Sequence, residues 1–293
     1  MRRPGVGWLR GPAAAVALLL LAAAAVPAAA AAQGQARPGR IVSLDLCTDQ
    51  LLVELVERGR IAAVTHLAAD PAVSAIPEMA RGISITRGVA EDVLRYDPDL
   101  VLAGPFGVSA TVDLLRRLGR NVVVVPLPSE LSGIAAAVRT VAAAVGEPAK
   151  GEAMLARFER RLAQLGPPAE PRPTAVIYQI GGSVSGPGSL ADAALAAAGF
   201  RNMVAAYRLT RGGQVPLEVL IARPPDLLVL SSAPDEYRTV LADNLRHPAL
   251  AALRARRPSL ELPWRHWLCG TPRIADAIER LAEARAALQA HRQ

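Results

Sequence analysis

The densest group of side chains able to bind a ligand is the tetrapeptide Trp264-Arg265-His266-Trp267. It places two of the chain's three tryptophans beside a cation and an imidazole. Aromatic planes stack on flat molecules, and a guanidinium forms charge-assisted hydrogen bonds to anionic groups. The alternative is that the indoles lie in a hydrophobic core, which we expect for at least one of Trp264 and Trp267. The segment predicts a site for a large flat or anionic molecule.

The only two cysteines, Cys47 and Cys269, lie far apart in the sequence. Three interpretations remain open: a disulfide, two free thiols, or a pair that contacts a metal or a ligand. Two cysteines alone do not give the spacing of a zinc site. The sequence therefore predicts no structural zinc and leaves a Cys47–Cys269 bridge as a hypothesis.

Single imidazoles offer weaker chemistry. His66 and His266 could each coordinate the metal centre of a ligand, although a lone histidine on a loop is more often polar surface. The chain's four histidines form no HExxH motif, and no GxSxG nucleophile motif is present. We therefore expect a protein that is not an enzyme, with no cofactor and no resident metal.

The first segment, 1–32, has the pattern of a secretory signal peptide. Three arginines, Arg2, Arg3 and Arg10, precede an apolar run over 13–26 and a tract of small residues. A membrane anchor is the alternative, but the run is short for a span. We expect an exported, soluble monomer. Removing the three leader arginines from the formal net charge of +7 leaves +4, interspersed with acids, and this balance does not suggest nucleic-acid binding.

Short apolar runs alternate with segments of helical periodicity after a polar tether over 33–39. This alternation predicts α/β layers with parallel strands. The expected strands cover 40–44, 61–65, 100–103, 122–125, 175–179 and 227–230, and the expected helices cover 48–57, 111–118, 131–145, 190–198 and 272–290.

One long amphipathic segment, 147–165, separates the two blocks and ends at Gly166-Pro167-Pro168. A helix of that length spans about 28 Å, enough to join two lobes as a stiff connection. We expect a first lobe over 40–146, an interlobe helix over 147–168 and a second lobe over 169–293. Thr271 and Pro272 are the expected N-cap and first residue of the final helix.

The two blocks share a motif. Glu91 precedes Pro98-Asp99 by seven residues, Glu218 precedes Pro225-Asp226 by the same seven, and an apolar run follows each Pro-Asp pair. This match indicates two related lobes. Ligands of such sheets contact the loops at the carboxyl ends of the strands. The expected ligand-binding residues are therefore Asp45, Cys47, His66, Phe106, Tyr178, Gln179, Trp264, Arg265, His266, Trp267 and Cys269.

Five segments in order resemble the periplasmic solute-binding proteins of iron-siderophore and cobalamin ABC importers. The first is similar to the opening strand and helix of that family, and the second and fourth to its helix, Pro-Asp and strand units. The third resembles the start of its second lobe and the fifth its final helix. They read RIVSLDLCTDQLLVEL, GVAEDVLRYDPDLVLAG, AVIYQIGGSVSGPGSLADAALAAAGFRN, VPLEVLIARPPDLLVLSS and CGTPRIADAIERLAEA.

The resemblance implies two α/β lobes joined by one rigid helix, with a ligand cleft between them and little closure. It also implies a periplasmic protein that delivers a ferric siderophore, cobalamin or a haem-like compound to a membrane permease. A glutamate of each lobe would contact permease arginines, and the matching positions are Glu91 and Glu218. The alternative is that both carboxylates are solvated at helix starts. A zinc or manganese importer subunit and a cleft enzyme are the competing functions.

One departure from that family concerns Cys269, which stands where the cobalamin-binding protein has an arginine. Cys47 aligns with the loop after the first strand. The substitution weakens the expectation of cobalamin itself as the ligand. Both cysteines would then face the cleft, where they could bridge the lobes or offer sulfur to a soft metal.

Overall fold

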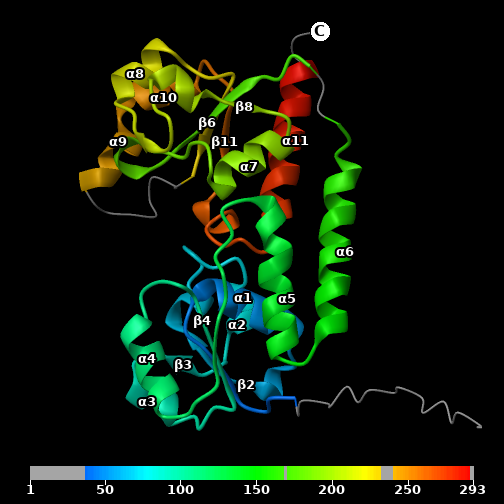
Figure 1. Ribbon diagram of the computed structural model, residues 1–293. Helices are drawn as coiled ribbons and strands as arrows, with labels where there is room; N and C mark the ends of the chain where they lie inside the picture. The colour runs from blue at the N-terminus through cyan, green and yellow to red at the C-terminus, as the bar shows by residue number, and fades with distance from the viewer. Residues whose placement is uncertain (1–36, 168–169, 232–239, 291–293) are drawn as a thin grey trace, which may run out of the picture. The chain divides into compact units, whose positions relative to one another are not determined.

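The computed structural model describes residues 37–167, 170–231 and 240–290 (Figure 1). The predicted signal peptide, 1–32, lies outside the described residues, as does the tether up to residue 36. The rest forms two α/β lobes, each built on its own sheet.

The first sheet is fully parallel, with strand order β3-β2-β1-β4-β5. Both central strands are completely buried, because helices cover a parallel sheet on its two faces. The strands are β1 (Ile41–Ser43), β2 (Ile61–Thr65), β3 (Ile85–Thr86), β4 (Leu100–Ala103) and β5 (Val122–Val124), and the helices are α1 (Leu46–Leu55), α2 (Pro77–Ala80), α3 (Ala90–Leu94), α4 (Ser109–Arg117) and α5 (Ile134–Ala144).

The second sheet has the order β11-β10-β6-β7-β9. Strand β8 pairs with the first residues of β6, on the edge of β6 opposite to β10. Its core is parallel, but β7 runs antiparallel to both of its neighbours, β6 and β9, which the sequence does not predict. Gly181 and Gly182, both at positive φ, turn the chain back after β6. The strands are β6 (Thr174–Tyr178), β7 (Ser183–Val184), β8 (Arg201–Asn202), β9 (Gly213–Gln214), β10 (Leu227–Leu230) and β11 (Ser259–Glu261), and the helices are α7 (Leu190–Ala197), α8 (Leu217–Ala222), α9 (Asp243–Arg246), α10 (Pro248–Arg254) and α11 (Ile274–Ala290).

The repeated Pro-Asp motif has the same structural role in both lobes. Asp99 Oδ2 accepts hydrogen bonds of 2.9 Å from the backbone N–H groups of Gly39 and Arg40, at the start of β1. Asp226 Oδ2 accepts from the backbone N–H of Thr174 at 2.7 Å, at the start of β6. Asp99, just before β4, thus ties that strand to β1, and Asp226, just before β10, ties that strand to β6. The order β8-β6-β10-β11 accordingly repeats the order β2-β1-β4-β5.

Helix α6 (Pro148–Gln164) follows the first lobe and lies alongside α5 (Figure 1). Its 17 residues give a length of about 26 Å. Glu147, just before the helix, pairs with Arg60 of the first lobe at 2.7 Å. Near the other end, Arg161 pairs with Asp276 and Glu279 of α11 at 2.6 and 2.7 Å. The helix is therefore attached to both lobes, while the predicted lobe boundaries at 146 and 169 stay predictions.

The final helix begins two residues later than predicted. Helix α11 starts at Ile274, so Pro272 is not its first residue, and Thr271 does not act as its N-cap. The Thr271 hydroxyl instead donates to Gln50 Oε1 of α1, at 3.2 Å. Thr271 therefore contacts the first lobe.

Candidate functional site

Three side chains of the first lobe stand at the carboxyl ends of its strands. His66 follows β2 and is exposed. Phe106 follows β4 and is 72% exposed, an unusual state for a phenylalanine. Leu127 follows β5 and is also exposed. This edge of the sheet therefore presents aromatic, aliphatic and imidazole groups to solvent, as a site for a partly apolar ligand would.

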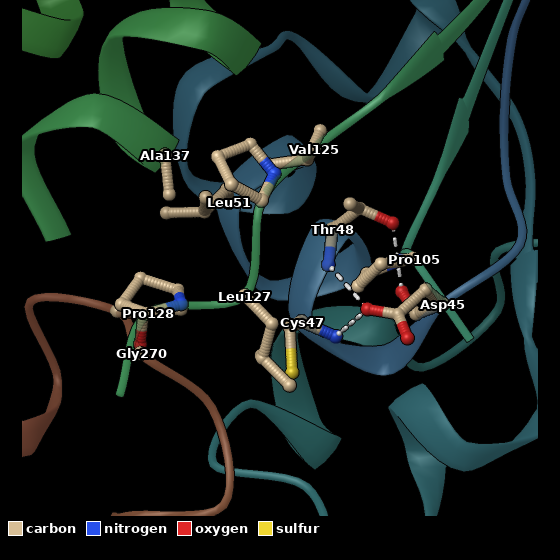
Figure 2. Close-up of a pocket in the computed structure, with 12 residues that line it drawn as sticks. Asp45, Cys47, Thr48, Leu51, Pro105, Val125, Leu127, Pro128, Ala137 and Gly270 are labelled. Atoms are coloured by element: carbon tan, nitrogen blue, oxygen red, sulfur yellow. Dashed lines mark hydrogen bonds between the residues drawn. The ribbon is translucent and has the colours of Figure 1, made fainter. Parts of the chain in front are cut away.

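Asp45 follows β1 and caps helix α1. Its Oδ1 accepts from the backbone N–H groups of Cys47 at 2.9 Å and Thr48 at 3.3 Å (Figure 2). Gly104 makes room for it, since a Cβ there would lie 2.6 Å from the carboxyl carbon. Asp45 also lines a small hollow with Pro105, Leu127, Pro128 and Gly270, among others. One carboxylate oxygen is thus engaged in the helix cap.

A buried polar group missed by the sequence analysis lies beneath this edge. Asp49 of α1 has no exposed surface and accepts from both the backbone N–H and the hydroxyl of Thr65, the last residue of β2. Burial raises the pKa of the Asp49 carboxyl to about 7, although hydrogen bonds from Ser43 and Thr65 oppose the shift. The sequence signal was an acid next to the apolar helix positions Leu51 and Leu52.

In the second lobe, Gln179 follows β6. Its side chain donates to Ser185 Oγ at 3.2 Å, and its backbone carbonyl accepts from Asn244 Nδ2 at 3.1 Å. Asn244 also accepts from the backbone N–H of Gly181, so it fixes the turn after β6. Asn244 was not predicted from the sequence. The stretch 232–239, after β10, lies outside the described residues.

Trp264–His266 form a short 3-10 turn after β11, and Trp267 follows the turn. Trp264 is half-buried, and Arg265 Nη1 donates to the backbone carbonyl of Pro71 in the first lobe at 3.0 Å. His266 Nδ1 is buried without a hydrogen-bond partner. Burial, followed by the nearby Arg265 charge, lowers the pKa of His266 and favours the neutral imidazole. Arg265 thus joins the lobes, whereas His266 Nδ1 is enclosed by protein.

Three of the residues predicted to contact a ligand are buried in this structure. Tyr178 is 1% exposed in the core, and its hydroxyl donates to the Val215 carbonyl at 3.4 Å. Burial raises the pKa of that hydroxyl. Trp267 is 6% exposed and packs in the main hydrophobic cluster, as expected for one of the two indoles. Cys269 is only 2% exposed. All three side chains are thus enclosed by protein in this conformation.

Cys47 and Cys269 form a disulfide across the two lobes. Their Cα atoms are 5.1 Å apart, within the range that the bond requires. Of the three interpretations that the sequence left open, the structure contains the disulfide. Cys47 keeps some exposure beside the small hollow, whereas its partner does not.

Glu91 and Glu218 occupy equivalent places on the two lobes. Each is the second residue of a short helix, α3 or α8, and each is exposed. These helices precede the equivalent strands β4 and β10. The shared sequence offset therefore corresponds to a shared position in space relative to each sheet.

Residues 37–167, 170–231 and 240–290 contain neither a metal cluster nor a membrane-spanning helix. In these ranges no group of three or more His, Cys, Asp or Glu residues is placed to hold a metal ion. No helix there has the length and apolar character needed to cross a membrane.

Two lobes on parallel-core sheets, with a connecting helix and exposed groups at the strand ends, are the architecture of class III periplasmic binding proteins. Residues 41–258 match the family model described as "Periplasmic binding protein". The chain therefore belongs to the periplasmic binding protein family.

Individual relatives agree with this assignment. A cobalamin-binding protein of Halobacterium salinarum is 27% identical over 205 residues, which cover 68% of this chain and 56% of that protein. The chain thus spans just over half the length of the curated relatives it matches. The apo periplasmic heme-binding protein RhuT from Roseiflexus sp. RS-1 has a TM-score of 0.70 and 27% identity, covering 85% of this chain and 98% of that one. For the vitamin B12-binding protein BtuF of Vibrio cholerae, the TM-score is 0.64 at 18% identity, with coverage of 86% and 98%.

Proposed function

We propose that this chain is the substrate-binding subunit of an ABC importer, which captures a metal chelate and delivers it to a membrane permease. The family match over residues 41–258 is the observation that carries this proposal. The chelate would be a ferric siderophore, cobalamin or a related corrinoid or haem-like compound, since the relatives named above bind cobalamin or heme. We infer no catalytic activity for the site.

The ligand would lie against the carboxyl ends of the strands. Phe106 is the leading candidate for stacking on a flat chelate, because its aromatic ring is exposed and a bound chelate would remove that apolar surface from water. His66 could contact the metal centre of the chelate. On the second lobe, Trp264, Gln179 and Arg265 are the matching candidates. Asp45 of the first lobe is a further candidate.

Docking to the permease would use Glu91 and Glu218. An exposed carboxylate on each lobe complements a basic partner surface, and the equivalent placement of the two suits a partner with two similar halves. The subunit would act in the periplasm as a monomer after removal of the signal peptide 1–32. Nucleic acid is not among the proposed partners.

Ligand titration tests the proposal directly. The protein without residues 1–32 is titrated with haemin, cyanocobalamin and a ferric hydroxamate, and tryptophan quenching and chelate absorbance are followed. We expect saturable binding of one compound. Phe106→Ala should weaken that binding about tenfold, which corresponds to the loss of one well-packed aromatic contact. Leu118→Ala, another exposed apolar residue at the end of α4, is the matched control.

A parallel titration with Zn²⁺ and Mn²⁺ tests the competing importer class. Saturable binding of a bare ion, without binding of any chelate, would replace the proposal with a zinc or manganese importer subunit. Binding of none of these compounds would refute both.

A further inference from the structure

One face of helix α1 is bonded to the segment that leads into α11. The bonded α1 residues are spaced by three and then four positions, which places them on one helical face. Their partners stand at every second position of the bend and turn that precede α11. We call the three pairs the ladder; they are the disulfide Cys47–Cys269, the hydrogen bond Gln50–Thr271 and the ion pair Glu54–Arg273.

The ladder joins the first lobe to the second. The bonds differ in kind, from covalent at Cys47 to an ion pair at Glu54, where the side chains keep some contact with water. Gly270, between two of the bonded residues, packs against Pro128 so closely that a Cβ would lie 2.7 Å from the proline ring. The segment therefore rests directly on the first lobe.

The middle and outer pairs are weaker than the covalent one. Gln50 accepts one hydrogen bond from Thr271, but its own Nε2 is buried without a partner. The pair Glu54–Arg273 is part-buried. A single neutral hydrogen bond contributes little net free energy compared with a covalent link. The disulfide is thus the strongest connection at the Cys47 end of the ladder.

We propose that the ladder is a clamp that fixes the angle between the lobes, and that its disulfide makes the clamp sensitive to reduction. A dithiol reductant would break the S–S bond with two electrons and two protons, leaving thiols at Cys47 and Cys269 while the reductant becomes a disulfide. Attack is directed to the Cys47 sulfur, which lines the small hollow beside Leu127 (Figure 2), whereas Cys269 is buried. The lobes would then separate first at that end.

Hydrogen–deuterium exchange of the oxidised, signal-free protein, before and after reduction with dithiothreitol, tests the clamp without any ligand. We expect the amides of 46–51 and 265–273 to exchange about tenfold faster after reduction, because local opening no longer requires breaking a covalent link. Strands β4 and β10 should exchange unchanged, which shows that the lobes stay folded. The double variant C47S/C269S should reproduce the reduced pattern.

A second variant separates a clamp from an inert crosslink. Glu54→Gln removes the ion pair at the far end, and it should speed exchange of 265–273 far more in the reduced than in the oxidised protein. Glu152→Gln, which breaks the exposed Arg139–Glu152 pair away from the ladder, is the control and should have no effect. Equal exchange in oxidised and reduced protein, or two reactive thiols in the unreduced exported protein, would overturn the proposal. If C47S/C269S does not fold, reduction of the unaltered protein decides.

Discussion

Replacing Asp49 by asparagine should change how stability depends on pH. The Asp49 carboxyl is completely buried against Thr65, and burial raises its pKa from 3.8 to about 7. In the unfolded chain the group ionises near its ordinary value. Between about pH 4 and pH 7 the folded protein therefore holds one proton more than the unfolded chain.

The sign follows from that extra proton. When the folded state binds more protons, the free energy of unfolding falls as pH rises, by about 1.36 kcal/mol per pH unit for one proton. Over the window between the two pKa values, Asp49 thus removes about 4 kcal/mol, and the loss is complete above pH 7. Asparagine keeps an oxygen to accept from Thr65 and cannot ionise. Asp49→Asn should accordingly be more stable than the parent at pH 8 by up to about 4 kcal/mol, and about equal at pH 4.

Urea unfolding at pH 5, 6, 7 and 8 measures this difference. The gap between Asp49→Asn and the parent should widen steadily up to pH 7 and then stay constant. Asp113→Asn, on the exposed face of α4, is the control and should show no widening. A gap that is independent of pH, or a variant less stable than the parent at pH 8, would refute the assignment of a protonated buried carboxyl.

Two further predictions concern the docking carboxylates and the connecting helix. Glu91→Arg or Glu218→Arg should abolish uptake in cells and leave the affinity of the isolated protein for its chelate unchanged. The control Glu159→Arg, on α6, should change neither uptake nor affinity. A large loss of affinity in the Glu91 or Glu218 variant would place that residue in the ligand site. Arg161→Met should lower the free energy of unfolding by about 1–2 kcal/mol in urea titrations, because it removes hydrogen bonds to two carboxylates of α11 that are only partly screened by solvent. An unchanged unfolding midpoint would show that α6 is held by apolar packing alone.

Elements with strong local signals could be predicted from the sequence. The strands 61–65, 100–103 and 227–230 match the structure residue for residue, because each is a short apolar run, two of them preceded by Pro-Asp. The amphipathic segment 147–165 agrees with helix α6 within one residue at each end, since its apolar face repeats at helical spacing, whereas the predicted interlobe helix 147–168 extends four residues past the end of α6. The two-residue strands β7 and β9 carry no such pattern. The glycine turn brings β7 back onto β6, and β9 then pairs with β7 from a distant part of the sequence.

The site was predicted less completely. Strand-end positions such as His66 and Phe106 are exposed, as their loops suggested. Aromatic character alone could not separate these from Tyr178, whose side-chain direction depends on the face of β6 it occupies. Thr271 was expected to cap the final helix, but α11 begins three residues after it, and its hydroxyl donates to Gln50 of the first lobe. A contact with a residue so distant in the sequence has no local signal.

The repeated build of the lobes has a consequence for bivalent recognition. Glu91 and Glu218 stand at equivalent positions of two similar sheets, and both α6 and the ladder tie those sheets together. The spacing between the two carboxylates is therefore set by the protein before any ligand arrives. A partner that engages both at once gains a high effective concentration for its second contact, because little further ordering is needed once the first has formed. If the distance between the two carboxylates became variable, the affinity of such a partner would fall, although neither contact residue had changed.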